Sequence, residues 1–166
     1  MADKTLDTLF HDTLKDIYYA ERKILKSLPK MVRAAQSPEL KAAFEKHIGQ
    51  TEGQIERLQQ VFELIGKTPR GKTCDAIEGI LAEGDEIAEE YKGAAALDAG
   101  LLAAAQAVEH YEITRYGTLK RWALVLGMKD AAALLDETLQ EESQTDTDLT
   151  AIADATVNAD AMKQAA

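Results

Sequence analysis

Apolar side chains recur along most of this chain at alternating intervals of four and three residues, the period of one buried helix face. Four stretches of this kind are long, and one is shorter and more polar. The predicted helices cover residues 6–33, 38–65, 75–92, 98–126 and 130–153. Ser37 followed by Pro38 is typical of a helix start, and Gly66 and Gly127 are typical of helix ends.

The connections between these helices predict how they pack. The first two long helices are joined by a break of only a few residues, and so are the last two, so each pair should form an antiparallel hairpin. Residues 67–92 are expected to cross over between the pairs. The pattern therefore predicts one all-α domain over residues 1–166, an antiparallel four-helix bundle with a short additional helix in the crossover. The bundle should cover about residues 5–153, and the Ala-rich tail 154–166 is expected to be frayed.

Glutamates interrupt the apolar seams near the middle of the long helices. Glu21 and Glu52 are equidistant from the break between the first two helices, and Glu112 and Glu142 are equidistant from the glycine that ends the fourth helix. Glu52 lies on the flank of its stripe, and Glu109 lies one turn before Glu112. Residues equidistant from a hairpin turn lie at the same level, so we expect these carboxylates to meet in one slice of the core.

Buried carboxylates without partners cost several kcal/mol each, and no Lys or Arg lies on the seams to neutralise them. One interpretation is that they tilt toward solvent or pair with the flanking Arg57, Arg115 or Lys23. The other is that they bind cations. Hard oxygen ligands suit Mn²⁺, Fe²⁺, Ca²⁺ or Mg²⁺, and two divalent ions would roughly balance such a cluster. Four glutamates at matched hairpin positions favour the metal site.

Composition excludes several classes of function. The net charge of −10 argues against nucleic acid and against an anionic membrane surface as partners. No apolar run approaches the roughly 20 residues of a spanning helix, and the first residues do not resemble a signal peptide. Cys74 is the only cysteine, which excludes an internal disulfide and favours a cytoplasmic location.

Three segments resemble the YciE/YciF family of bacterial ferritin-like proteins: HIGQTEGQIERLQQVFELIG (47–66), AAAQAVEHYEITRYGTLKRWALVLG (103–127) and LLDETLQEESQTDTDL (134–149). The resemblance covers about residues 3–155. It implies a ferritin-like fold, an association with the stress response, a cytoplasmic location and a homodimer. From the di-iron carboxylate superfamily it implies metal-ligand roles for Glu21, Glu52, Glu109, Glu112 and Glu142.

One departure from the superfamily pattern bears on activity. The two Glu-x-x-His motifs of di-iron proteins would begin at Glu52 and Glu142, but the histidine positions hold Ile55 and Thr145. The site would then be all-oxygen, or completed by water, by Asp146 or by another neighbouring side chain. His47 faces the core, where we expect a hydrogen-bonded histidine rather than a ligand.

The sequence thus supports a stress-associated protein with a di-metal centre that handles peroxide, oxygen or iron. Iron is the expected cofactor and manganese the alternative; any enzymatic activity would be that of a di-metal oxidoreductase. The competing hypothesis is a metal-free helical bundle that acts through protein contacts. Iron storage in a cage is a weaker third, because nothing in the sequence predicts a 24-subunit shell.

Overall fold

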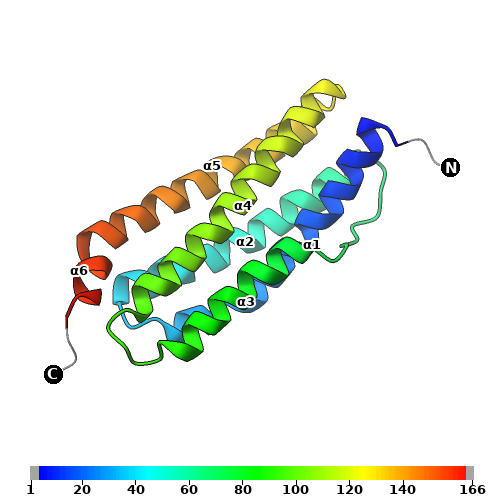
Figure 1. The fold of residues 1–166 in the computed structure, drawn as a ribbon. Coiled ribbons are helices and arrows are strands. Elements are labelled where there is room, and N and C mark those ends of the chain that lie inside the picture. The colour runs from blue at the N-terminus through cyan, green and yellow to red at the C-terminus, as the bar shows by residue number, and fades with distance from the viewer. Residues whose placement is uncertain (1–3, 164–166) are drawn as a thin grey trace.

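The computed structural model describes residues 4–163, which form helices joined by short loops (Figure 1). The described part of the chain contains no strand, and each of the five main helices begins and ends within two residues of its predicted bounds. The helices are α1 (Leu6–Ala34), α2 (Pro38–Leu64), α3 (Asp75–Glu90), α4 (Leu97–Val125) and α5 (Lys129–Ile152), followed by the π-helical turn η1 (Ala153–Val157) and the short helix α6 (Asn158–Ala161).

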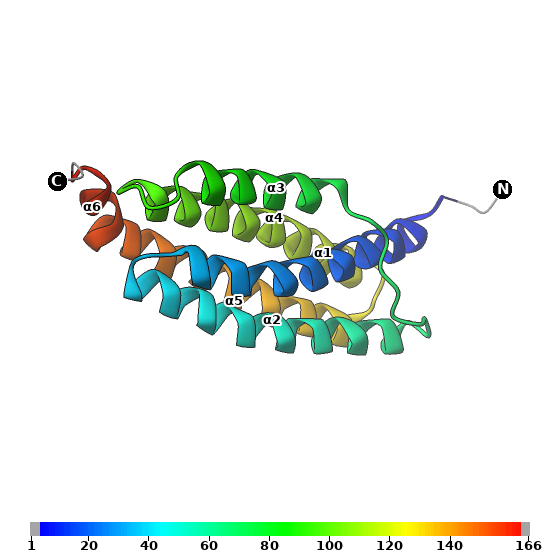
Figure 2. The same cartoon turned by 90° about the horizontal axis from the view of Figure 1, so that it is seen from below.

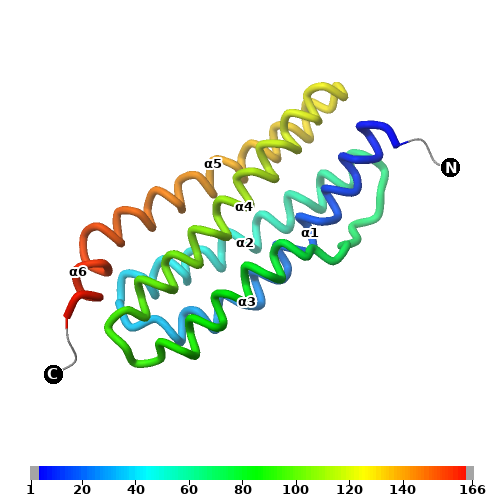
Figure 3. The backbone as a smooth tube through the Cα atoms, in the orientation of Figure 1, coloured from blue at the N-terminus to red at the C-terminus, as the bar shows by residue number. Residues whose placement is uncertain are grey.

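The long helices form a four-helix bundle made of two hairpins. α1 packs against α2, and α4 packs against α5; the hairpins then meet through contacts of α1 with α4 and of α2 with α5. Following the chain from blue to red shows that neighbouring long helices run in opposite directions (Figures 1 and 3). α3 belongs to the crossover and contacts both α1 and α4 (Figure 2). The predicted antiparallel bundle with an additional crossover helix is therefore confirmed.

The helix ends follow from local residue chemistry. The Ser37 hydroxyl caps the N-terminus of α2, and Gly127 adopts a φ of 77° in the turn between α4 and α5, a conformation that glycine reaches without strain. Asp98 joins two distant turns, because its carboxylate accepts hydrogen bonds from the backbone N–H groups of Gln36 at 2.8 Å and Ser37 at 2.6 Å. The end of the crossover is thereby held against the start of α2.

The core is built from the seams of the long helices, and polar groups occupy its middle. α1 buries a regular series at four-three spacing: Phe10, Leu14, Ile17, Glu21, Ile24 and Leu28. α2 buries a series at the same spacing: Leu40, Phe44, His47, Thr51, Gln54, Leu58 and Val61. Because each series continues through polar residues without changing its period, the bundle must bury those polar groups along with the apolar ones.

The chain beyond Ala153 differs from the expected frayed tail. It continues as η1 and α6, and both contact α4. Val157 is 2% exposed and Ala153 is also buried, so two apolar side chains four residues apart dock this segment onto the bundle. The last three residues of the expected tail lie outside the described residues. None of the described helices is both long and apolar enough to cross a membrane.

Candidate metal centre

Four of the five glutamates predicted as site residues are buried in the core. Glu21 comes from α1, Glu109 and Glu112 from α4, and Glu142 from α5, and each is at most 2% exposed. One carboxylate oxygen from each of Glu109, Glu112 and Glu142, together with a ring nitrogen of His47, lies within 4.8 Å of the others. We call these four residues with Glu21 the carboxylate cluster; it draws on all four long helices.

Glu52 does not join the cluster, and this expectation is corrected. Its side chain is exposed, whereas the neighbouring Thr51 is fully buried on the core side of α2. Hairpin symmetry predicted only the level of Glu52 along the bundle. Successive residues of a helix point about 100° apart, so a residue at the right level can still face away from the core. The apolar Ile48 and Ile55, beside which Glu52 was placed, are only partly buried, and the fully buried stripe of α2 runs through His47 and Gln54.

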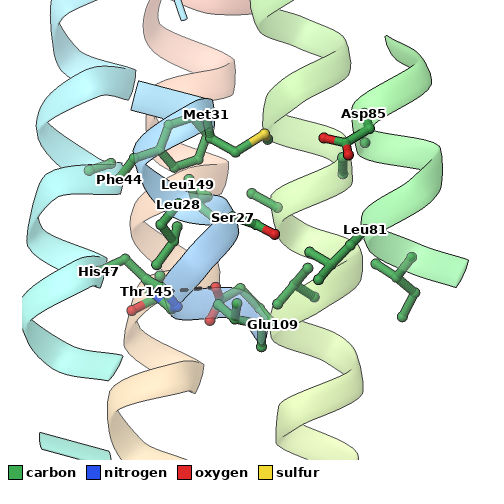
Figure 4. Close-up of a pocket in the computed structure, with 17 residues that line it drawn as sticks. Ser27, Leu28, Met31, Phe44, His47, Leu81, Asp85, Glu109, Thr145 and Leu149 are labelled. Atoms are coloured by element: carbon green, nitrogen blue, oxygen red, sulfur yellow. Dashed lines mark ion pairs between the residues drawn. The ribbon is translucent and has the colours of Figure 1, made fainter. Parts of the chain in front are cut away.

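His47 takes the place on α2 that was expected for Glu52. It is 3% exposed, and its Nδ1 lies 3.5 Å from Oε1 of Glu109 (Figure 4). Neither ring nitrogen has a hydrogen-bond partner among the described residues, so the expectation of a hydrogen-bonded core histidine is not met. A signal was present in the sequence, because His47 lies three residues after Phe44 and four before Thr51, in phase with the buried seam.

The carboxylate oxygens of the cluster are almost entirely without partners. Both oxygens of Glu112 and Glu142 and one oxygen of Glu109 and Glu21 are buried with no hydrogen-bond partner in the described part of the chain. Of the two remaining oxygens, Oε1 of Glu21 accepts a hydrogen bond from the hydroxyl of the fully buried Tyr116, and Oε1 of Glu109 is the oxygen that lies 3.5 Å from Nδ1 of His47. Such a concentration of unpaired buried acceptors calls for a physical explanation.

Among residues 4–163, the basic side chains nearest the cluster pair with acidic groups outside it. Arg57 forms hydrogen bonds to both carboxylate oxygens of Glu141, which lies next to Glu142 but outside the cluster. Lys23 pairs with Glu78 of α3 at 2.9 Å between Nζ and Oε1. The Nε of Arg115 lies 4.0 Å from Oδ2 of Asp16. The flanking cations considered as partners for the glutamates are therefore engaged elsewhere.

Burial, and then mutual repulsion, shift the protonation of the cluster. Burial raises the pKa of Glu21 to about 8 and that of Glu142 to about 7, and it raises the pKa of Glu109 and of Glu112 well above the usual value. Burial also lowers the pKa of His47 to about 4. Because the imidazole of His47 is therefore neutral at neutral pH, its close approach to Glu109 is not an ion pair.

Ile55 and Thr145, which stand where di-iron proteins have histidines, offer no nitrogen ligand. The hydroxyl of Thr145 donates a hydrogen bond to the backbone carbonyl of Glu141 at 3.0 Å, and Ile55 packs against the apolar core. Asp146, considered as a substitute ligand, lies 3.1 Å from Nε2 of the exposed His110. The imidazole that lies close to the carboxylates belongs instead to His47, two turns before Ile55.

The donor set fits divalent metal ions. Neutral imidazole and carboxylate oxygens are both ligands of first-row metals such as iron and manganese, and here they stand close together without competing partners. Four carboxylates would balance the charge of two divalent cations. Bound cations would also satisfy the buried oxygens and nitrogens that the protein leaves unpaired.

Comparison with known proteins agrees with this fold over nearly the whole chain. Protein YciF of Escherichia coli (strain K12) is 44% identical over 164 residues, covering 98% of each chain. The crystal structure of the E. coli stress protein YciF matches with a TM-score of 0.89 at 43% identity, covering 94% of this chain and 99% of that one.

Two further solved structures are similar. YcfI of Rhodopseudomonas palustris, for which a structural role has been suggested, matches with a TM-score of 0.87 at 46% identity. The match covers 89% of this chain and 94% of the R. palustris chain. A Xanthomonas campestris protein at 22% identity shares the fold with a TM-score of 0.73, over 93% of this chain and 95% of its own. The family model described as a domain of unknown function, DUF892, matches residues 5–162. The chain therefore belongs to the DUF892 family and is a homologue of the E. coli stress protein YciF.

Proposed function

We propose that this chain is a ferritin-like, stress-associated protein that binds a di-metal centre, of iron or alternatively manganese, in the carboxylate cluster. The observation that carries the proposal is the burial of four carboxylates and one imidazole whose polar atoms have almost no partner among the described residues. The stress association is supported by the similarity to E. coli YciF, which is described as a stress protein.

Metal binding explains the cluster better than protonation does. Protonated carboxyl groups would avoid the buried charge and could share hydrogen bonds within the pairs Glu21–Glu112 and Glu109–Glu142. The ring nitrogens of His47 would still have no partner, and an unsatisfied buried group costs about 1–3 kcal/mol. Metal ions replace the protons and coordinate the oxygens in one step. The low pKa of His47 also keeps its ring neutral, which is the form that binds metal.

Two ions are favoured over one by charge and by the number of donors. His47, Glu109, Glu112 and Glu142 are close enough to surround one ion. Glu21 brings a fourth carboxylate, with Oε2 free. The nearby carboxylate of Glu142 raises the pKa of Glu21, and the carboxylates of Glu142 and Glu21 both raise the pKa of Glu112. Ferritin-like di-iron and di-manganese proteins assemble their sites from carboxylates and imidazoles of the same four helices.

The chain's own groups would orient and protect such a centre. The Tyr116 hydroxyl fixes the carboxylate of Glu21 through a hydrogen bond, and the surrounding core excludes bulk water. Bound iron or manganese would supply electron transfer toward peroxide or oxygen, so the enzymatic class would be a di-metal oxidoreductase. Handling of iron itself is the other use of the same centre.

Metal content per chain tests the proposal. The protein is purified without chelators, loaded anaerobically with Fe²⁺, and measured by elemental analysis as wild type, Glu112→Gln and Glu52→Gln. We expect about two ions per chain in the wild type, as in ferritin-like carboxylate sites, and a loss of at least half in Glu112→Gln. Glu52→Gln is the matched control, because it removes an exposed carboxylate at the same level of the bundle and should retain the metal.

The competing function predicts a different result. Absence of metal from the wild type after Fe²⁺ loading would contradict the proposal and favour a metal-free bundle that acts through protein contacts. Equal loss from Glu112→Gln and Glu52→Gln would show that binding is superficial. The structural role suggested for the R. palustris relative would then be the better guide.

A further inference from the structure

A series of polar side chains crosses the wall of the bundle between α2 and α5, beside the carboxylate cluster. It begins at Glu137 of α5, whose side chain is 64% exposed, and continues to Glu141, whose side chain is 28% exposed. Gln54 of α2 is fully buried, and its Nε2 donates a hydrogen bond to Oε2 of Glu141 at 3.1 Å. Exposure thus falls stepwise from the surface to Gln54, and we call these three residues the polar path.

Gln54 connects the polar path to the cluster. It lies on the same buried stripe of α2 as His47. Burial raises the pKa of Glu142 to about 7, while the charge of Arg57 and the amide of Gln54 lower it, so both groups lie near this carboxylate. Oε1 of Gln54 is buried and has no hydrogen-bond partner among the described residues. An oxygen left unpaired at this depth is available as a ligand for a cation.

The guanidinium of Arg57 covers the outer part of the polar path. Its Nη1 and Nη2 donate hydrogen bonds to Oε2 and Oε1 of Glu141 at 2.9 and 2.5 Å, and its Nε lies 3.3 Å from Oε2 of Glu137. Nη1 also donates to the hydroxyl of the fully buried Thr138 at 3.2 Å. Two carboxylates and a hydroxyl therefore surround one positive charge, and oxygen ligands of this kind are those that hard divalent cations prefer.

Open space lies beside the guanidinium. Gly53 precedes Arg57 by one turn on the same face of α2, and a Cβ built on Gly53 would meet no atom within 4 Å. The side chain of Arg57 is 19% exposed, so it can turn outward and exchange its contacts for water. This movement would leave Glu137 and Glu141 without their counter-ion, at the surface of a protein whose net charge of −10 already attracts cations.

We infer that Glu137, Glu141 and Gln54 form an entry site for divalent metal ions. Arg57 keeps this site closed, because its guanidinium stands where the cation would bind. An incoming ion displaces the guanidinium, exchanges water ligands for oxygens of Glu141 and Gln54, and passes to Glu142. The inference rests on the proposed function, because it describes how metal reaches the proposed centre. It concerns the rate of loading and not the number of ions that the centre holds.

The rate of metal uptake tests the inference. Mn²⁺ is mixed with the metal-free protein, and the decline of the EPR signal of free Mn²⁺ is followed with time. Arg57→Met removes the guanidinium and should make the initial uptake roughly fivefold faster, because the two carboxylates are then free to bind the ion. Glu141→Gln removes the central ligand and should make the uptake roughly fivefold slower. The final Mn²⁺ content should equal that of the wild type in both variants.

A second ion pair between the same two helices supplies matched controls. Nζ of Lys46 in α2 lies 3.0 Å from Oδ2 of Asp148 in α5, and the two side chains are 57% and 42% exposed. Lys46→Met changes the net charge by the same amount as Arg57→Met, and Asp148→Asn by the same amount as Glu141→Gln. Both controls should load at the wild-type rate, because they leave the polar path intact.

The outcomes separate the entry site from the metal centre itself. Opposite changes in Arg57→Met and Glu141→Gln, with unchanged controls, support the inference. Wild-type rates in both variants, or equal acceleration in Arg57→Met and Lys46→Met, overturn the entry site although the centre still binds metal. A wild type that takes up neither Mn²⁺ nor Fe²⁺ overturns the proposed function, and the entry site with it. Should Arg57→Met fail to fold, the comparison of Glu141→Gln with Asp148→Asn decides alone.

Discussion

At the scale of single residues, the unusual feature is a set of carboxylates in positions where a bundle normally has apolar side chains. Glu21, Glu112 and Glu142 are fully buried, each in phase with its helix's apolar seam. Replacing them by leucine would give an ordinary core, so their burial works against the stability of the metal-free protein. This conflict between stability and residue choice is typical of functional sites.

The metal-free protein should lose stability as the pH rises from 6.5 to 8.5. The folded-state pKa of Glu142 is raised to about 7 and that of Glu21 to about 8, both above the unfolded value of 4.5. In this window the folded state still holds protons that the unfolded state has released, so the free energy of unfolding falls with rising pH and levels off once the folded carboxyl groups have ionised as well. We expect a loss of about 2–3 kcal/mol, or roughly 5–10 °C in Tm.

His47 sets the lower limit of this pH range, and a substitution of Glu21 provides the control. Below pH 6.5 the lowered pKa of His47 acts in the opposite direction, because the unfolded histidine then binds the proton. Thermal melts in the presence of a chelator measure how Tm changes with pH. The substitution Glu21→Gln should make this change smaller. A Tm that stays constant or rises between pH 6.5 and 8.5 would show that the buried carboxyl groups do not carry the raised pKa values.

Residue identity alone did not decide which side chains meet. The sequence predicted that Glu21, Glu109, Glu112 and Glu142 are buried together, because each interrupts a clear four-three seam. The same reasoning failed for Glu52, since the stripe of α2 contains both polar and apolar residues on two adjacent faces. Only packing against α1 and α5 selects the face that contains His47.

At the scale of elements, the docking of α3 depends on a small residue in α4. A Cβ built on Gly100 would lie 2.6 Å from Cγ2 of Ile87 in α3, closer than real side-chain contacts allow. Ile87 is β-branched and cannot move aside without changing its rotamer or shifting its helix. Close approach of α3 and α4 therefore requires glycine at this position.

Gly100→Ala should destabilise the protein, while Gly117→Ala should stabilise it. Overpacking at Gly100 is expected to cost about 1–3 kcal/mol in the free energy of unfolding and to reduce amide protection in α3. Gly117 lies on the same helix, and a Cβ there would meet no atom within 4 Å, so alanine should add about 0.5–1 kcal/mol. Denaturant unfolding measures the change in the free energy of unfolding, and hydrogen exchange measures amide protection in α3. Equal effects of the two substitutions would contradict the close docking of α3.

At the scale of the whole molecule, the cluster links all four long helices, so metal binding and bundle assembly are coupled. Each of α1, α2, α4 and α5 contributes at least one residue. Cations that bind only the folded arrangement stabilise it by mass action. The net charge of −10 further favours attraction of cations to the protein.

The native assembly is expected to be a homodimer, as the resemblance to the YciE/YciF family implies. Apolar side chains exposed at the surface, including Leu9, Leu64 and Val125, are available for such a contact. Light scattering coupled to size-exclusion chromatography should give the mass of two chains. The mass of one chain would contradict the dimer, and a mass near that of 24 chains would favour storage in a cage.

The sequence by itself determined the extent of the helices, the hairpin pairing and the level of the carboxylates along the bundle. These properties depend on local periodicity, on turn residues such as Gly127 and on the constant rise per helical residue, so they can be read from one chain. The tertiary structure alone decided the rotation of α2, and with it the choice of His47 over Glu52. It also decided the docked tail, because this depends on which surfaces of different helices fit together.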